Sequence, residues 1–450
     1  MTANFESMSP ILIKGATIVN EGSSKVADLL IRNGRIEKIA DIINPGGATR
    51  EINAEGLLLL PGVIDDQVHF REPGLTHKAT IASEARAAVA GGVTSFMEMP
   101  NTSPAALTQA LLEEKYQRAA QTSVANYSFF MGTANDNADE VLRTNDRRKD
   151  ICGIKIFMGS STGSMLVDNY LTLNKIFSEA EILIATHCED ENIINANKKK
   201  YAEADHAGFH PLIRDVDACF ENSFTAVQLA MKHNTRLHIL HISTAKELQL
   251  FGNMLPLKEK RITAEVCVHH LHFTSEDYEQ FGNLIKCNPA IKAPENKTAL
   301  WQGLLDDRLD IIATDHAPHT WEEKQLPYQQ APSGVPLVQH SLLLMLQYVQ
   351  QGKLTVEKLV EKMAHAPAVC FQMLERGYIR EGYWADLVLV DMKDSSPVTK
   401  ASLEYKCGWS PFEGHEFPAK IRYTFVNGHL AYNDGRVDDS VKGSRLLFDR

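Results

Sequence analysis

Between residues 62 and 370 the chain alternates short apolar runs with longer amphipathic stretches such as KATIASEARAAVAGG (78–92), and this alternation restricts the possible folds more than any other feature. Alternating strands and helices predict an α/β protein with a parallel sheet. Eight runs, with no Gly-x-Gly-x-x-Gly after the first, favour a closed (β/α)8 TIM-type barrel over an open, doubly wound sheet. The predicted strands are VIDDQVH (63–69), VTSFMEM (93–99), VANYSFF (124–130), ICGIKIF (151–157), ILIATH (182–187), RLHILH (236–241), ITAEVCV (262–268) and LDIIATD (309–315).

The two ends of the chain have a different pattern, which is rich in short β-like runs and glycine turns. ILIKGATIVN (11–20) and ADLVLVDM (385–392) are examples, and Asn427-Gly428 between two apolar runs predicts a hairpin. We therefore expect the ends to pair into one small β-sandwich domain. The expected divisions are residues 1–60 and 372–450 for this small domain and residues 61–371 for the barrel.

Composition and charge exclude several classes of protein. Apolar residues make up 44% of the chain and charged residues 23%, as in globular proteins and unlike disordered chains. The net charge of −11 disfavours nucleic acid and anionic membranes as partners, and no apolar stretch approaches the ~18 residues of a membrane span. Seven scattered cysteines without a Cys-x-x-Cys pair indicate a reducing, cytoplasmic location rather than a disulfide framework.

Five of the predicted strands carry a residue suited to metal binding or acid–base chemistry at or near the same end. In a (β/α)8 barrel this end of the sheet holds the active site. On the first strand, Gln67 points to the same side as the histidine two positions later, because strand residues alternate. Imidazole, carboxylate and a modified lysine together suit Zn²⁺ or a similar divalent ion. The five residues are His69, Lys155, His187, His241 and Asp315.

The lysine of this group lies in an otherwise apolar run, Ile154-Lys155-Ile156-Phe157. An ammonium group that is buried without a partner is strongly unfavourable. Two interpretations therefore remain open. One is a buried ion pair with an acid such as Asp315, and the other is a covalently modified Lys155 whose charge is inverted.

Six motifs extend over nearly the whole chain. They are PGVIDDQVHFREPG (61–74), MPNT (99–102), GIKIFMGSS (153–161), THCEDE (186–191), HILHIST (238–244) and TDHAPH (314–319). In these motifs and their order the chain resembles the cyclic amidohydrolases, and most closely the dihydroorotases. The resemblance implies a (β/α)8 barrel with two zinc ions bridged by a carboxylated Lys155. It also implies that His187 and His241 hold one ion and that His69 and Asp315 hold the other.

Two positions depart from the pattern of that family. Its first strand usually carries His-x-His, and Gln67 replaces the first of these histidines. A neutral amide oxygen is a weaker zinc ligand than imidazole, so Gln67 predicts either a weakly bound ion or a water at that position. Many dihydroorotases also have Asp where this chain has Lys155. The run GIKIFMGSS (153–161) is closer to the hydantoinases and dihydropyrimidinases, which are the alternative.

The residues that would bind substrate favour a dihydroorotase over a hydantoinase. Arg71, Asn101 and His319 match the three positions that the resemblance assigns to the substrate carboxylate, and the hydantoinase pattern lacks the arginine. An arginine offers a bidentate fork to a carboxylate, although Arg71 alone is also compatible with a salt bridge to Glu72 or Asp66. The resemblance also implies that two further residues, Asn288 and Gly334, contact the pyrimidine ring of the substrate.

The resemblance implies reversible cyclisation of N-carbamoyl-L-aspartate to (S)-dihydroorotate in pyrimidine biosynthesis, with this small molecule as the partner and a homodimer as the assembly. Bound metal lowers the pKa of a water toward ~7, and Asp315 would pass the proton of that water to the leaving ring nitrogen. A third hypothesis is a non-catalytic homologue that serves as a scaffold. Gln67 is its only support, because the other candidate ligands are present.

Three further histidines, His269, His270 and His272, follow the seventh predicted strand. Neighbouring residues of a strand face opposite sides of the sheet. The sequence therefore predicts structural roles for these histidines rather than a joint site. The stretch 321–336, which is rich in Gln and Pro, is expected to form a loop over the active site.

Overall fold

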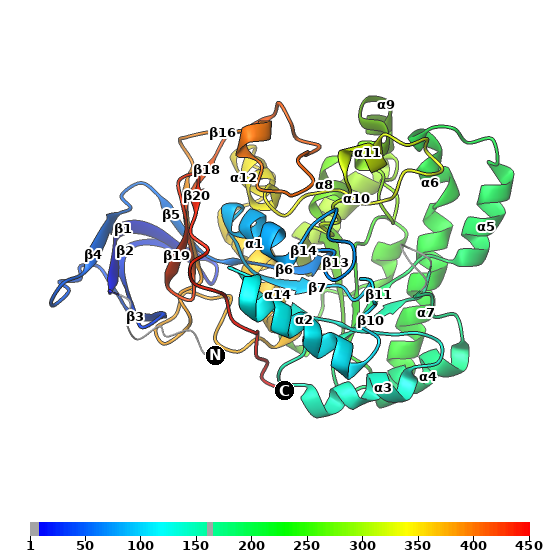
Figure 1. Ribbon diagram of the computed structural model, residues 1–450, viewed down its shortest axis with the longest axis horizontal. Coiled ribbons are helices and arrows are strands. Elements are labelled where there is room, and N and C mark those ends of the chain that lie inside the picture. The colour runs from blue at the N-terminus through cyan, green and yellow to red at the C-terminus, as the bar shows by residue number, and fades with distance from the viewer. Residues whose placement is uncertain (1–8, 160–164) are drawn as a thin grey trace.

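The structure is a computed structural model that describes residues 9–159 and 165–450, and it contains a closed barrel with a smaller sheet domain beside it (Figure 1). All neighbouring barrel strands are parallel. The barrel closes where Val68 forms a parallel bridge with His316 and where the His69 N–H donates to the His316 carbonyl at 2.7 Å. The predicted (β/α)8 barrel is thus confirmed. Its strands are β6 (Val63–Val68), β7 (Val93–Glu98), β8 (Asn126–Phe129), β9 (Met131–Gly132), β10 (Ile154–Phe157), β11 (Ile184–His187), β12 (Leu237–Ile239), β13 (Ile262–Cys267) and β14 (Ile311–Ala313), with β8 and β9 as two parts of one strand.

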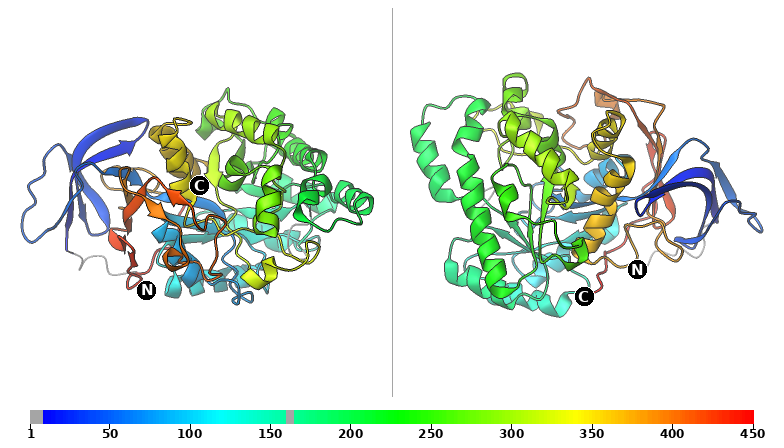
Figure 2. Two further views of the ribbon diagram at one scale, coloured as in Figure 1. Left: turned by 90° about the horizontal axis from the view of Figure 1, so that it is seen from above. Right: turned by 180° about the vertical axis from the view of Figure 1, so that it is seen from behind.

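Helices cover the outside of the barrel (Figure 2). Helix α1 (Ile81–Ala90) shows how the sequence sets their ends: the Thr80 side chain accepts from the Ser83 N–H at the N-terminus, and Gly91 forms the C-cap. Between β12 and β13 the described chain forms only short 3-10 turns. The remaining helices are α2 (Gln109–Thr122), α3 (Ala138–Leu142), α4 (Tyr170–Glu179), α5 (Glu191–Lys200), α6 (His210–Ile213), α7 (Val216–His233), α8 (Val268–His272), α9 (Tyr278–Phe281), α10 (Pro294–Leu305), α11 (Trp321–Lys324), α12 (Ser341–Gln350), α13 (Val356–Val360) and α14 (Ala366–Phe371).

The small domain is a mixed sheet that takes strands from both ends of the chain, as the predicted fold class requires. The two contributions meet where β5 and β15 pair in antiparallel register, with Leu59 opposite Leu389. The Asn427-Gly428 pair has φ values of +50° and +76°, which suits the tight hairpin predicted between β18 and β19. The strand order is β20-β19-β18-β15-β5-β1-β2-β3, and β4 pairs with β1. The strands are β1 (Ile11–Asn20), β2 (Ser23–Arg32), β3 (Arg35–Ala40), β4 (Arg50–Asn53), β5 (Leu58–Pro61), β15 (Leu387–Asp391), β18 (Lys420–Val426), β19 (His429–Asn433) and β20 (Arg436–Val437), and a separate pair is β16 (Ser396–Pro397) with β17 (Glu416–Phe417).

The C-terminal segment 443–450 lies against the barrel, although the expected division at residue 372 assigns it to the small domain. The Leu446 N–H donates to the Tyr127 carbonyl at 2.9 Å, and the Arg445 guanidinium lies 3.5 Å from the centre of the Tyr116 ring. This segment therefore extends the contact between the last strands of the chain and the barrel. Across the two described ranges, helices of the length and apolarity that a membrane crossing needs are absent.

Candidate active site

Three of the predicted site residues meet where β6 and β14 end. His69 Nε2 lies 3.0 Å from Asp315 Oδ1, and Gln67 Nε2 donates to the same oxygen at 3.2 Å. On its other side, His69 Nδ1 lies 2.8 Å from Asn101 Oδ1. Burial lowers the pKa of His69, so the neutral ring donates only one proton. If that proton goes to Asn101, the Nε2 lone pair faces the Asp315 carboxylate, an arrangement that a cation between them would stabilise.

The two remaining histidines form a second group at the ends of β11 and β12. His187 Nδ1 lies 3.0 Å from His241 Nε2, and His241 Nδ1 is buried without a hydrogen-bond partner among the described residues. Behind them, His187 Nε2 lies 3.2 Å from Glu189, which pairs with Arg214. Burial alone would raise the pKa of Glu189, but Arg214 and His187 lower it to about 2. A carboxylate behind an imidazole is typical of metal-ligating histidines.

Lys155 lies between these two groups on β10. Its side chain is 1% exposed and its Nζ lies 4.5 Å from the centre of the Phe157 ring. Burial lowers the pKa of Lys155 to about 7, against the opposing charge of Asp315. Burial is also the main cause that lowers the pKa of His187 and His241, and the charge of Lys155 lowers both further. The ion pairs among the described residues include His69 with Asp315 but not Lys155 with Asp315. The buried ion pair with Asp315, which was the first interpretation of Lys155, is therefore not formed.

Three of the predicted site residues have left-handed backbone conformations. The φ angles are +69° for Arg71, +41° for His241 and +50° for Asp315. Residues with a Cβ rarely adopt this region, and each instance costs of order 1–3 kcal/mol. Such strain is concentrated at sites where the direction of a side chain matters more than stability.

The predicted carboxylate-binding residues line one cavity of 480 Å³. Arg71, Asn101 and His319 all contribute to its wall, and Arg71 Nη2 lies 3.1 Å from His319 Nε2. Burial lowers the pKa of Arg71 only to about 10, so the guanidinium stays charged at neutral pH. Arg71 Nε donates to the Pro318 carbonyl at 3.0 Å. Because Asn101 also contacts His69, the cavity adjoins the first group of candidate ligands.

One cation of this cavity was not predicted from the sequence. Lys78 Nζ donates to His319 Nδ1 at 2.9 Å and lies 3.0 Å from Glu323. The other ring nitrogen, His319 Nε2, lies 2.9 Å from the Ser333 carbonyl and 3.1 Å from Arg71 Nη2. Lys78 stands outside the strand ends and belongs to no motif, so the sequence carried no signal for it.

The two residues expected to read the pyrimidine ring lie in different surroundings. Gly334 lies against His319, and with φ +148° a Cβ on it would come within 2.3 Å of the Ala317 carbonyl. Asn288 lines a second cavity of 550 Å³, where its Oδ1 lies 2.9 Å from His210 Nε2. The two cavities are neighbours across one loop, because Pro332 lines the first and Ser333 lines the second.

Two buried lysines hold the loop expected over the site. Lys324 Nζ donates to the carbonyls of Pro332 and Gly334 at 2.9 Å each. Lys286 Nζ donates to the carbonyls of Tyr328 and Ala331 at 2.7 and 2.6 Å. Neither lysine was predicted from the sequence to bind this loop, because lysines usually lie at the surface. Their contacts fix the backbone that faces the cavity.

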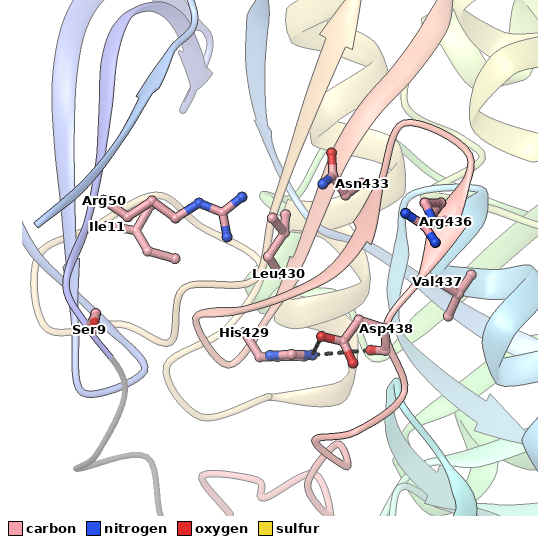
Figure 3. A pocket seen from close by; sticks show the side chains of 9 residues that line it. All are labelled: Ser9, Ile11, Arg50, His429, Leu430, Asn433, Arg436, Val437 and Asp438. Atoms are coloured by element: carbon pink, nitrogen blue, oxygen red, sulfur yellow. Dashed lines mark hydrogen bonds and ion pairs between the residues drawn. The ribbon is translucent and has the colours of Figure 1, made fainter.

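A cavity of 710 Å³ in the small domain contains none of the predicted site residues. It lies between the N-terminal strands and the β19–β20 hairpin (Figure 3). His429 on its wall contacts the Asp438 carbonyl through Nε2 at 3.1 Å. Volume alone therefore does not mark the active site, whereas the convergence of imidazole, carboxylate and lysine side chains in the barrel does.

Comparison with known proteins identifies the class to which this fold and site belong. The pattern of the amidohydrolase family matches residues 58–431. Because the match covers most of the chain, the chain belongs to the amidohydrolase family, whose enzymes are generally metal-dependent.

Within that family the chain is similar to dihydroorotases. It is 33% identical to the dihydroorotase of Halobacterium salinarum over 418 residues, which cover 92% of this chain and 95% of that protein. It is 32% identical to the dihydroorotase of Methanosarcina acetivorans over 448 residues, which cover 96% and 93%. These relatives confirm the resemblance to dihydroorotases that the motifs indicated, and they confirm an enzyme that hydrolyses cyclic amides.

Solved structures of related enzymes share the fold. The L-hydantoinase (dihydropyrimidinase) from Arthrobacter aurescens superimposes with a TM-score of 0.91 at 26% identity, covering 98% of this chain and all of that one. The dihydropyrimidinase from Brevibacillus agri superimposes with a TM-score of 0.87 at 22% identity, covering 98% and 100%, and this similarity supports the fold alone. The sequence relatives favour the dihydroorotases over this alternative.

Proposed function

We propose that the chain is a metal-dependent dihydroorotase that interconverts N-carbamoyl-L-aspartate and (S)-dihydroorotate. The observation that carries the proposal is the 480 Å³ cavity in which Arg71, Asn101 and His319 lie together beside His69. A buried arginine is the side chain best suited to a substrate carboxylate, and dihydropyrimidines carry no carboxylate at that carbon. The similarity to dihydroorotases of two archaea supports the same substrate.

The donor set suits two zinc ions. His187 and His241 would hold one ion, and His69 and Asp315 would hold the other, because imidazole and carboxylate are ordinary zinc ligands. Lys155 would bridge them as a carbamate: its neutral amine adds to carbon dioxide and releases a proton, and the lowered pKa of Lys155 favours that neutral amine. When bound, the two ions would polarise the substrate carbonyl and lower the pKa of a water.

We assign Gln67 the role of a hydrogen-bond donor to Asp315 rather than that of a metal ligand. Its Nε2 donates to Asp315 Oδ1 at 3.2 Å, and its Oε1 lies 3.7 Å from the Cys267 thiol, which donates to it. Both ends of the amide thus have protein partners. In this arrangement Gln67 orients the carboxylate, and the missing histidine lowers the affinity of one ion without removing the site.

Asp315 is the residue we assign to proton transfer. Its Oδ1 accepts from Gln67 and contacts His69, whereas no hydrogen bond to Oδ2 is found among the described residues. In the hydrolytic direction, water adds to the ring carbonyl carbon, and Asp315 accepts the proton of that water. As the carbon–nitrogen bond breaks, Asp315 returns the proton to the leaving nitrogen. The same positions, in reverse order, close the ring.

An assay of purified protein with two substrates, together with metal analysis, tests this function. Turnover of dihydroorotate without comparable turnover of dihydrouracil supports a dihydroorotase. The opposite preference would establish a dihydropyrimidinase, which the high structural similarity to the Arthrobacter enzyme makes the second candidate. Fewer than one metal ion per chain and no turnover of either substrate would favour the scaffold hypothesis.

The proposal includes a place in cytoplasmic pyrimidine biosynthesis and a homodimeric assembly. All seven cysteines are free, and six of them are buried, which supports a reducing compartment. Sedimentation of the purified protein tests the dimer, because a mass equal to one chain would contradict it.

A further inference from the structure

A second group of potential metal ligands lies outside the proposed pair of ions. His269 and His270 on α8 and Cys287 bring their ligand atoms within 4.8 Å of one another, and none of the three residues is more than 3% exposed. The sequence predicted that the histidines would face opposite sides of a strand. Instead, β13 ends at Cys267 and the chain turns into α8, which places the two rings with centroids 4.1 Å apart.

The hydrogen bonds leave nitrogen lone pairs of these histidines without donors. His270 Nε2 donates to the Pro289 carbonyl at 3.2 Å, so its neutral ring carries the lone pair on Nδ1. This Nδ1 is buried without a hydrogen-bond partner among the described residues, and the His269 ring meets only the Thr314 backbone. A carbonyl that fixes the tautomer of an imidazole while the other nitrogen stays free is the arrangement seen behind metal-ligating histidines.

A second cluster of potential ligands differs because its histidine is paired with carboxylates inside the cluster. Asp66, His238 and Glu265 are also close enough to hold an ion, but His238 Nε2 lies 3.3 Å from Asp66 and 3.4 Å from Glu265. The imidazolium of His238 therefore supplies a cation inside this cluster. The group of His269, His270 and Cys287 contains no such internal cation.

We propose that His269, His270 and Cys287 bind a third metal ion of the zinc class, separate from the proposed catalytic pair. Two imidazoles and a thiolate are a donor set for zinc and related late transition metals. With Zn–N bonds of about 2.0–2.1 Å and a Zn–S bond of about 2.3 Å, tetrahedral zinc separates its ligand atoms by about 3.3–3.6 Å, which lies below the 4.8 Å limit within which the three ligand atoms are found. On binding, the Cys287 thiol releases its proton as the metal–sulfur bond forms.

This third ion has a structural consequence for the 550 Å³ cavity. Cys287 precedes Asn288, which lines the 550 Å³ cavity, and the ion would fasten this segment to α8. His270 and Cys287 already converge on the Pro289 carbonyl, at 3.2 Å each. The ion therefore positions Asn288 and does not itself contact the reacting atoms.

Cobalt substitution tests the proposal, because the proposed catalytic pair contains no cysteine. With Co²⁺ as the only metal, a thiolate-to-cobalt charge-transfer band reports this site alone. We expect the band in the wild type, its loss together with one cobalt per chain in Cys287→Ser, and its retention in Cys267→Ser. Cys267 is the matched control, since it is also a buried thiol of the barrel and contacts Gln67 rather than the cluster.

Absence of the band from the wild type, or its persistence in Cys287→Ser, would overturn the proposal. If Cys287→Ser does not fold, X-ray absorption of the wild-type zinc protein decides instead. A sulfur scatterer at about 2.3 Å from part of the zinc supports the site, and zinc with only nitrogen and oxygen neighbours refutes it. Neither readout depends on turnover, so failure of the proposed function would be recognised separately.

Discussion

Replacing Arg71 by Gln removes the guanidinium from the 480 Å³ cavity while leaving a side chain that can still donate a hydrogen bond. The guanidinium is 3% exposed, so its contact with a carboxylate is shielded from water. Truncating one partner of a buried charge pair costs about 2–5 kcal/mol. At about 1.36 kcal/mol for each factor of ten, this corresponds to a roughly 30- to 5,000-fold loss of kcat/KM for dihydroorotate.

The assay compares kcat/KM for dihydroorotate and dihydrouracil in Arg71→Gln and in a control, Arg118→Gln. The Arg118 side chain is 42% exposed and pairs with Glu114 on its own helix, so its loss should leave both values within about twofold of the wild type. Dihydrouracil carries no carboxylate for Arg71 to bind. A fall of less than about tenfold for dihydroorotate, or equal losses for both substrates, would refute the assigned role of Arg71.

Four further predictions concern the proposed metal centre and the cluster of Asp66, His238 and Glu265. Asp315→Asn keeps the shape but cannot carry the proton, so kcat should fall by about 10²- to 10⁴-fold; near-normal turnover in a steady-state assay would exclude proton transfer by Asp315. Lys155→Ala should abolish turnover and lower the metal content measured per chain, and unchanged metal content would argue against a bridging carbamate. Gln67→His should tighten zinc binding in chelator competition, because imidazole is the better ligand, whereas unchanged affinity would show that position 67 does not face the ion. Burial alone would lower the pKa of His238, but Asp66 and Glu265 raise it to about 9; the stability from this proton is complete below about pH 6.5 and is lost as pH rises through about 9. Denaturant unfolding of the metal-free protein measures this loss, and a flat profile would contradict it.

The barrel strands were predictable because short apolar runs alternate with amphipathic stretches, some of which have recognisable helix caps such as Thr80 and Gly91 of α1. That regularity also brought His69 and Asp315 to the same end of the sheet, where β6 meets the residues after β14. Their individual contacts were not predictable. Which oxygen Gln67 would face depends on tertiary packing, which strand alternation does not specify.

Two kinds of residue escaped sequence reasoning. The ends of β13 and α8 were misjudged because the apolar run ITAEVCV (262–268) passes into His269 and His270 without a glycine or proline to mark a turn. Buried cations such as Lys324 bind only backbone carbonyls. Every residue has a backbone carbonyl, so no pattern of side chains in the sequence predicts where such a lysine will be buried.

The energetics of the site argue against a catalytically silent scaffold. Left-handed conformations at Arg71, His241 and Asp315 together cost about 3–9 kcal/mol at 1–3 kcal/mol each, a large share of the 5–15 kcal/mol that typically stabilises a domain. A His69 Nε2 lone pair that faces the Asp315 carboxylate would add to this cost. A ligand that binds only the folded chain offsets such strain through mass action, and cations between these side chains would do so where the strain is stored. A scaffold has no need of the strain, because relaxing it would make the same fold more stable.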